Sequence, residues 1–218
     1  MEKLPISTAN ATPLTMQWRG VVTLQNEVYL KDQRSHWHRC FQIETANPLA
    51  LRHHSVFTLN IDDDKPLDDG TIVTMAGELI APNDGTESMI VMYGEVEVLT
   101  PTAAILSGHR LNNLAVHSRG IVLQRTGDEN NWSSLIVNHN VFVNSSVRWI
   151  WYTAMYVDIG DKVLPMLTDL RSGSIVDLSG TVLEYNDESN MWIIQVRITW
   201  PNMNVSDKSF MLPEPLRA

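Results

Sequence analysis

The sequence has little cysteine, little positive charge and no long hydrophobic run. Cys40 is the single cysteine among 218 residues, so no disulfide can form within the chain. Sixteen Lys and Arg face 25 Asp and Glu, and the formal net charge is −9. This charge argues against a non-specific polyanion binder, because such binding depends on basic side chains that neutralise phosphates. No stretch approaches the roughly 18 consecutive apolar residues that cross a bilayer. We therefore expect an intracellular protein, nuclear or cytoplasmic, with no membrane partner.

Motifs that carry enzyme chemistry are also missing. The chain contains no G-x-S-x-G, Walker loop, dinucleotide-binding fingerprint or H-E-x-x-H motif. The acidic run at residues 62–64, with Asp68 and Asp69, is more typical of a solvated loop than of a cation site. We therefore expect no enzymatic activity and no cofactor.

One group of residues has the chemistry of a metal site. On a strand, His36, His38 and Cys40 would project from one face, and His53 and His54 could lie on the neighbouring strand. Imidazole and thiolate bind zinc or copper. However, a cysteine on a strand is more often a core residue, and the second half of the chain has no counterpart. We therefore expect no metal.

The strongest positive signal is an internal repeat with an offset of 100 to 103 residues. Trp18-Arg19-Gly20-Val21-Val22 is followed a hundred residues later by Ser118-Arg119-Gly120-Ile121-Val122. Two further pairs of segments match in the same order: residues 69–80 (DGTIVTMAGELI) with 172–183 (SGSIVDLSGTVL), and residues 83–91 with 186–194. Three matches in register indicate a duplication.

Both copies have strand-like patterns. Residues 71–80 and 175–183 alternate between β-branched or apolar residues and small or polar ones, and turn residues follow each of them. Gly77 and Gly180 interrupt these strands, which indicates bulges or places where two backbones approach closely. Gly20 and Gly120 are expected to let a long first strand bend from one half of a barrel to the other.

The positions of these glycines and valines resemble those of the OB-fold family. The resemblance rests on Gly20-Val21-Val22 with residues 70–77, and on Gly120-Ile121-Val122 with residues 173–180. It implies an all-β protein of two tandem small five-stranded β-barrels joined by a short linker. Among OB-fold proteins, the chain resembles the tandem modules of replication protein A-like proteins, which bind single-stranded nucleic acid. A pair of immunoglobulin-like or other small β-sandwiches is the alternative fold.

Composition divides the chain into five parts. Flexible ends are expected to flank the two barrels, and a partly helical linker is expected to join them. The expected boundaries are residues 1–14 for a flexible N-terminal arm, 15–101 for the first barrel, 102–115 for the linker, 116–202 for the second barrel and 203–218 for a C-terminal tail.

Aromatic and basic residues cluster where an OB-fold would bind a single strand. The resemblance implies that these side chains form a stacking platform in a basic groove. The candidates are Arg34, His36, Trp37, Arg39, Phe41 and Arg52 in the first copy, and Arg125, Trp132, Arg148, Trp149 and Trp151 in the second. Trp149 and Trp151 share one strand face and Arg148, Ile150 and Tyr152 the other, and the sequence leaves open which face is buried.

Two functions follow from this pattern. The first is non-enzymatic binding of single-stranded DNA or RNA by paired barrels. The alternative is a protein-interaction or assembly module, including self-association, because ten Met, seven Trp and an acidic surface also suit a protein partner.

Overall fold

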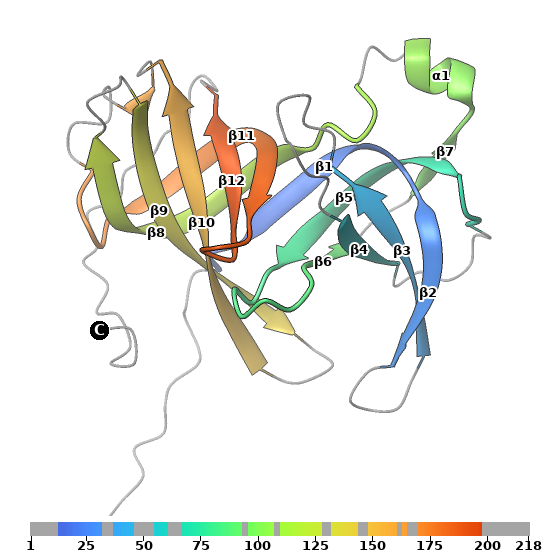
Figure 1. Cartoon of the computed structure of the whole chain (residues 1–218), viewed down its shortest axis with the longest axis horizontal. Coiled ribbons are helices and arrows are strands. Elements are labelled where there is room, and N and C mark those ends of the chain that lie inside the picture. Colours follow the sequence, from blue (N-terminus) through green and yellow to red (C-terminus); the bar gives the residue numbers. More distant parts are fainter. Residues whose placement is uncertain are drawn as a thin grey trace, which may run out of the picture.

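The computed structural model is built almost entirely from β-strands (Figure 1). Its description covers residues 13–31, 37–45, 55–60, 67–92, 96–106, 110–127, 132–143, 148–160, 163–164 and 170–197.

The strands fall into an N-terminal and a C-terminal half. The N-terminal half contains β1 (Met16–Thr23), β2 (Gln25–Lys31), β3 (Trp37–Glu44), β4 (Ser55–Asn60), β5 (Ile72–Ile80), β6 (Met89–Met92) and β7 (Glu97–Leu99). The short helix α1 (Pro101–Leu106) follows. The C-terminal half contains β8 (Ala115–Gly127), β9 (Trp132–Val143), β10 (Arg148–Ile159), β11 (Ile175–Asn186) and β12 (Met191–Val196).

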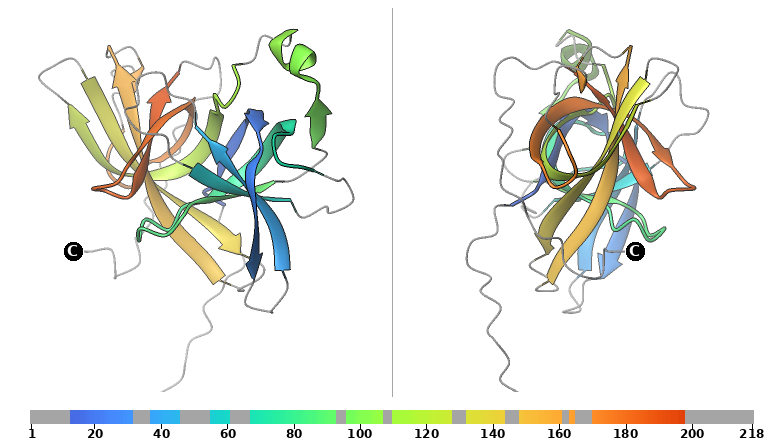
Figure 2. Two further views of the ribbon diagram at one scale, coloured as in Figure 1. Left: turned by 45° about the vertical axis from the view of Figure 1, so that its right-hand side comes forward. Right: turned by 90° about the vertical axis from the view of Figure 1, so that its left-hand side faces the viewer.

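The C-terminal half is a closed barrel of five strands. β8 pairs with β9, β9 with β10, β10 with β12, β12 with β11, and β11 returns to β8. The β10–β12 pair is parallel and the other four are antiparallel. Viewed nearly end-on, these strands curl into a ring (Figure 2, right). Closure removes the sheet edges that would otherwise seek partners, and it confirms the expected all-β barrel in place of a sandwich here.

The N-terminal half repeats this succession of pairings. β3 pairs with β2 and β4, β4 runs parallel to β6, and β6 pairs with β5, which pairs in turn with β1. β1 and β2 are separated only by Leu24, so together they correspond to the single long strand β8.

A tight turn recurs in the two halves with the same hydrogen bonds. Gly70 donates its N–H to the Leu24 carbonyl at 2.7 Å, and Gly173 donates to the Val122 carbonyl at 2.8 Å. Both glycines have positive φ, +83° and +90°, which favours glycine. The residue after each glycine donates its N–H to the carbonyl three residues back, at 3.0 Å in both turns.

The strand glycines lie where neighbouring backbones approach closely. A Cβ on Gly77 would come within 2.6 Å of the Val91 carbonyl oxygen, and one on Gly180 within 2.4 Å of the Gln195 carbonyl oxygen. The expectation of close approach at these glycines is therefore confirmed. The register shift on β11 comes later, between Val182 and Glu184.

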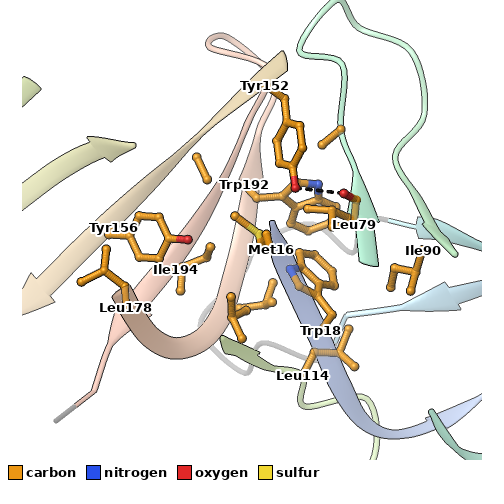
Figure 3. Close-up of a cluster of buried hydrophobic side chains, with 14 of the residues drawn as sticks. Met16, Trp18, Leu79, Ile90, Leu114, Tyr152, Tyr156, Leu178, Trp192 and Ile194 are labelled. Atoms are coloured by element: carbon orange, nitrogen blue, oxygen red, sulfur yellow. Dashed lines mark hydrogen bonds between the residues drawn. The ribbon is translucent and has the colours of Figure 1, made fainter. Parts of the chain in front are cut away.

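The two halves share one hydrophobic core. β1 pairs with β8 through Met16–Arg19 and Ala115–Ser118, so the strands form one continuous sheet. Behind this seam the Trp18 ring packs edge-on against Trp192, with ring centroids 4.9 Å apart (Figure 3). Both side chains are buried. Burial of two such large rings holds the halves in one arrangement.

The structure describes parts of the segments that join and flank the two halves. α1 overlaps the first residues of the expected linker, 102–106. Leu14, which was assigned to the flexible N-terminal segment, is buried beside Ile121 and Ile175, so the described end of that segment packs on the C-terminal barrel. Residues 1–12 and 198–218 lie outside the described residues. Within the described part of the chain, no helix is long and apolar enough to cross a membrane.

Candidate nucleic-acid interface

Three exposed aromatic side chains lie together on β9 and β10. Trp149 and Trp151 are 38% and 39% exposed, and Phe142 is 41% exposed. Trp149 lies directly opposite Phe142 across the two strands, with ring centroids 5.3 Å apart. We call Phe142, Trp149 and Trp151 the aromatic patch. Adjacent exposed rings of this size are a candidate contact surface.

Strand alternation explains why this face is exposed. Tyr152 and its neighbour across the pair, His139, point into the barrel and are buried, as is Val141. Successive side chains on a strand point to opposite faces, so Trp149 and Trp151 must point outward. The structure thus decides the question that the sequence left open.

The patch lies at the end of a long hairpin. β9 and β10 are each 12 residues long and pair along their whole length, from Trp132 with Ile159 to Val143 with Arg148. β12 pairs with β10 only from Ala154 onward. The remainder of the hairpin extends past the barrel (Figure 2, left). We call residues 140–143 and 148–153 the arm.

In the N-terminal half, the candidate side chains that the structure describes, those of Arg39 and Phe41, are paired or buried. The Arg39 guanidinium contacts Glu27 through two bonds of 2.6 and 2.9 Å and lies 3.6 Å from Asp68. Its hydrogen bond holds the pKa of Glu27 below the usual value. Arg39 also lies over the Phe41 ring, 5.0 Å from its centroid, and Phe41 is 2% exposed. Phe41 is therefore a core residue, which corrects its assignment to a stacking surface.

Arg125 is exposed but distant from the aromatic patch. It pairs with Leu135, seven residues before Phe142 on β9, which places it roughly 23 Å away along the strand. Its guanidinium donates to the Leu164 carbonyl at 3.0 Å and so holds the segment after β10. The structure does not bring Arg125 into one site with the two tryptophans.

The other candidates are placed by their backbone or not at all. Trp37 begins β3, Trp132 begins β9, and Arg148 begins β10 beside Trp149. Arg34, His36 and Arg52 lie outside the described residues.

The metal hypothesis gains no support from the described residues. Among them no group of three or more His, Cys, Asp or Glu side chains is arranged to hold an ion. Cys40 is buried, as expected for a core residue. His36, His53 and His54 fall outside the described residues.

Phe142 is the residue that sequence reasoning missed. Its signal was present, because Asn144-Ser145-Ser146 is turn-forming and lies midway between Phe142 and Trp149. A hairpin centred there places these two rings opposite each other.

Acidic turns border the base of the arm. Burial raises the pKa of Tyr185, and the charges of Asp187 and Asp84 raise it further, so both carboxylates lie near this ring. Asp84 comes from the turn after β5 and Asp187 from the turn after β11. Negative charge at this border would repel a phosphate chain.

No protein-family model matches the chain, and no curated protein matches it. Solved structures do. The wild-type single-stranded DNA binding protein from Thermus aquaticus superimposes with a TM-score of 0.51 at 13% identity, covering 95% of this chain and 100% of that one. A deletion mutant of that protein gives 0.51 and 13%, covering 91% and 97%. This chain has an OB-type fold. At this identity the likeness extends to the fold alone, and it agrees with the five-strand closure of β8 to β12.

Proposed function

We propose that this protein binds single-stranded DNA or RNA through the aromatic patch on the arm, and that its halves are tandem OB-type barrels from a duplication. The observation that carries the binding proposal is the cluster of exposed rings of Phe142, Trp149 and Trp151 on a strand pair that leaves the barrel. Nucleic-acid bases stack on such rings whatever their sequence.

The spacing of the two tryptophans suits stacked bases. Residues two apart on a strand are separated by about 6.6–6.8 Å. Stacked nucleotides are about 3.4 Å apart along one strand, so the two rings are about two base steps apart. Trp149 and Trp151 can therefore contact two bases of one strand, separated by a single intervening base, from the same face.

Electrostatics predict modest affinity. The chain carries a net charge of −9. In the N-terminal half, the candidate Arg39 already pairs with Glu27 and Asp68. Stacking then supplies most of the binding energy, about 1–3 kcal/mol per base. With only one or two phosphates neutralised, affinity should fall less than about tenfold between 50 and 200 mM salt.

The duplication is supported at two levels. The sequence matches keep a nearly constant offset, and Gly70 and Gly173, a matched pair, occupy turns with the same hydrogen bonds. The halves also repeat one succession of strand pairings. Duplicated modules lengthen a binding footprint, because a second contact becomes intramolecular.

The test is a titration of a fluorescently labelled single strand of about 30 nucleotides, followed by anisotropy at 50 and 200 mM salt. The variant Trp149→Ala/Trp151→Ala should lose at least about tenfold in affinity, since each ring contributes stacking. Tyr29→Ala is the matched control, because Tyr29 is an exposed ring on β2 in the other half. Equal affinity of the double variant and the control would refute the role of the patch.

A second candidate function is contact with a protein partner. It is favoured by exposed apolar side chains around the linker, where Val98, Ile105 and Leu106 are 53%, 79% and 80% exposed. Absence of any single-strand binding at 50 mM salt would favour this function.

A further inference from the structure

The arm is held from the side by the N-terminal half. The carboxamide of Asn83, in the turn after β5, contacts both backbone polar groups of Thr153, its N–H and its carbonyl. Its Oδ1 accepts the Thr153 N–H, and its Nδ2 donates to the Thr153 carbonyl at 3.1 Å. Nδ2 also donates to the carbonyl of Asn190, in the turn between β11 and β12. One side chain thus joins the arm to two turns.

Asn83 takes the place of a strand at the edge of β10. β12 pairs with β10 from Ala154 onward, and Asn83 bonds the residue immediately before, Thr153. A carboxamide has one acceptor and one donor group, like a peptide, so it satisfies both backbone groups of Thr153. On this edge, the described residues provide no strand partner for 148–152. Asn83 is therefore the last backbone contact there before the aromatic patch.

A second bond from the same strand region supports the contact. The Tyr152 hydroxyl donates to the Leu79 carbonyl on β5 at 2.9 Å, across the junction of the halves (Figure 3). Tyr152 and Thr153 are consecutive, and Trp151 directly precedes them. Two adjacent arm residues are thus tied to the N-terminal half next to an exposed ring.

We infer that Asn83 is a positioning residue for the aromatic patch, so that the N-terminal half sets the orientation of the binding arm on the C-terminal barrel. This inference rests on the proposed function where affinity is concerned. Without the carboxamide, Thr153 loses two backbone hydrogen bonds and the 3.3 Å hydrogen bond of its hydroxyl, and the arm gains freedom. That freedom must be lost when a strand binds, which weakens binding without altering the contacts themselves.

The choice of variant follows from the backbone of Asn83. Its φ is +58°, in the left-handed region that asparagine and glycine tolerate and alanine does not. Asn83→Gly therefore removes the carboxamide without straining the turn. Asn26→Gly is the matched control: Asn26 also has positive φ, +49°, and its carboxamide bonds the exposed Gln42 side chain at 2.9 Å, away from the arm.

The first experiment is hydrogen exchange of the arm amides in wild type, Asn83→Gly and Asn26→Gly, with no nucleic acid present. Asn83→Gly should exchange at least about tenfold faster at Thr153, with faster exchange extending to residues 149–152, while Asn26→Gly matches wild type. Wild-type exchange at Thr153 in Asn83→Gly would overturn the inference. This readout remains decisive even if the protein binds no single strand, which would refute only the proposed function.

The second experiment is a double-mutant cycle on affinity for the labelled 30-nucleotide strand. Asn83→Gly should weaken binding about three- to tenfold in the wild-type background and leave the salt dependence unchanged. It should have no further effect in Trp149→Ala/Trp151→Ala, because its effect passes through the patch. An equal loss in both backgrounds would show a merely structural role and overturn the inference.

Discussion

The two halves share an order of strands but differ in the surface they offer. In the N-terminal half, Phe41 is buried and Arg39 is engaged by Glu27 and Asp68. In the C-terminal half, Trp149 and Trp151 are exposed. The two halves therefore share one succession of pairings, while the candidate side chains just named are engaged or buried in the N-terminal half and exposed in the C-terminal half.

Strand length accounts for much of this difference. β9 and β10 have 12 residues each, whereas their counterparts β3 and β4 have eight and six. Barrel closure uses only part of each strand, since β12 pairs with four residues of β10. Residues beyond the closed part have one face free of the core, so extra length creates a surface.

The largest effect is expected where the two halves meet. Trp18→Ala removes a fully buried ring that packs edge-on against Trp192, which costs about 3–5 kcal/mol of unfolding free energy. Thermal and denaturant unfolding, followed by circular dichroism, measures this loss. If the halves are one unit, wild type unfolds in one transition, and separate transitions for wild type would contradict the shared core.

Acid should act on a buried network of the C-terminal barrel. His139 Nδ1 lies 2.9 Å from the Arg119 carbonyl, which can only accept, so Nδ1 carries the proton and Nε2 accepts from the Tyr156 hydroxyl at 3.2 Å. Burial lowers the pKa of His139 to about 4. The unfolded chain, with a pKa near 6.5, binds the proton first, so stability is lost as pH falls from about 6.5 to 4.

The size of this acid effect is about 3 kcal/mol, because each pKa unit corresponds to about 1.4 kcal/mol. Denaturant unfolding at pH 7, 5.5 and 4 measures it. His139→Gln cannot titrate and should show a shallower dependence on pH over this range. The same slope in both proteins would mean that His139 is not the group responsible.

Gly77 and Gly180 occupy matching strand positions, so substituting each tests whether the two halves respond with the same loss of stability. Gly77→Ala and Gly180→Ala each place a Cβ against a neighbouring carbonyl, and each should cost about 1–3 kcal/mol. Gly127→Ala is the control, since nothing lies within 4 Å of its Cβ, and it should change stability by less than about 0.5 kcal/mol. A large difference between Gly77→Ala and Gly180→Ala in chemical denaturation would break the equivalence.

The smallest effect is expected from Arg39→Ala on binding. Its guanidinium already contacts Glu27 and Asp68, so its removal should change affinity for the labelled single strand less than about twofold. The anisotropy titration that tests the tryptophans measures this as well. A loss as large as that of Trp149→Ala/Trp151→Ala would show that Arg39 leaves Glu27 to contact phosphate, and the contrast between the halves would disappear.

The strands and turns could be predicted from local patterns in the sequence. The alternation at residues 71–80 and 175–183 corresponds to β5 and β11, and Gly70 and Gly173 lie in the turns before them. These features depend on neighbours in the chain, so a periodic pattern and a turn residue suffice to predict them.

The candidate site was predicted less completely, because exposure depends on distant partners. Trp149 and Trp151 were placed on one face, yet only packing of the opposite face around Tyr152 and His139 turns them outward. From the sequence, Phe41 and Trp149 were both predicted to stack on bases. In the structure Phe41 belongs to the core, whereas Trp149 does not.

The sequence by itself determined that this chain is a β-protein, because hydrophobic alternation and turn-forming glycines act over a few residues. Tertiary structure alone decided which aromatic rings face solvent and which half holds the arm. Asn83 and Thr153 are 70 residues apart, and their contact exists only because β1 pairs with β8 and brings the two halves together. Such contacts depend on the packing of whole barrels, which no local pattern specifies.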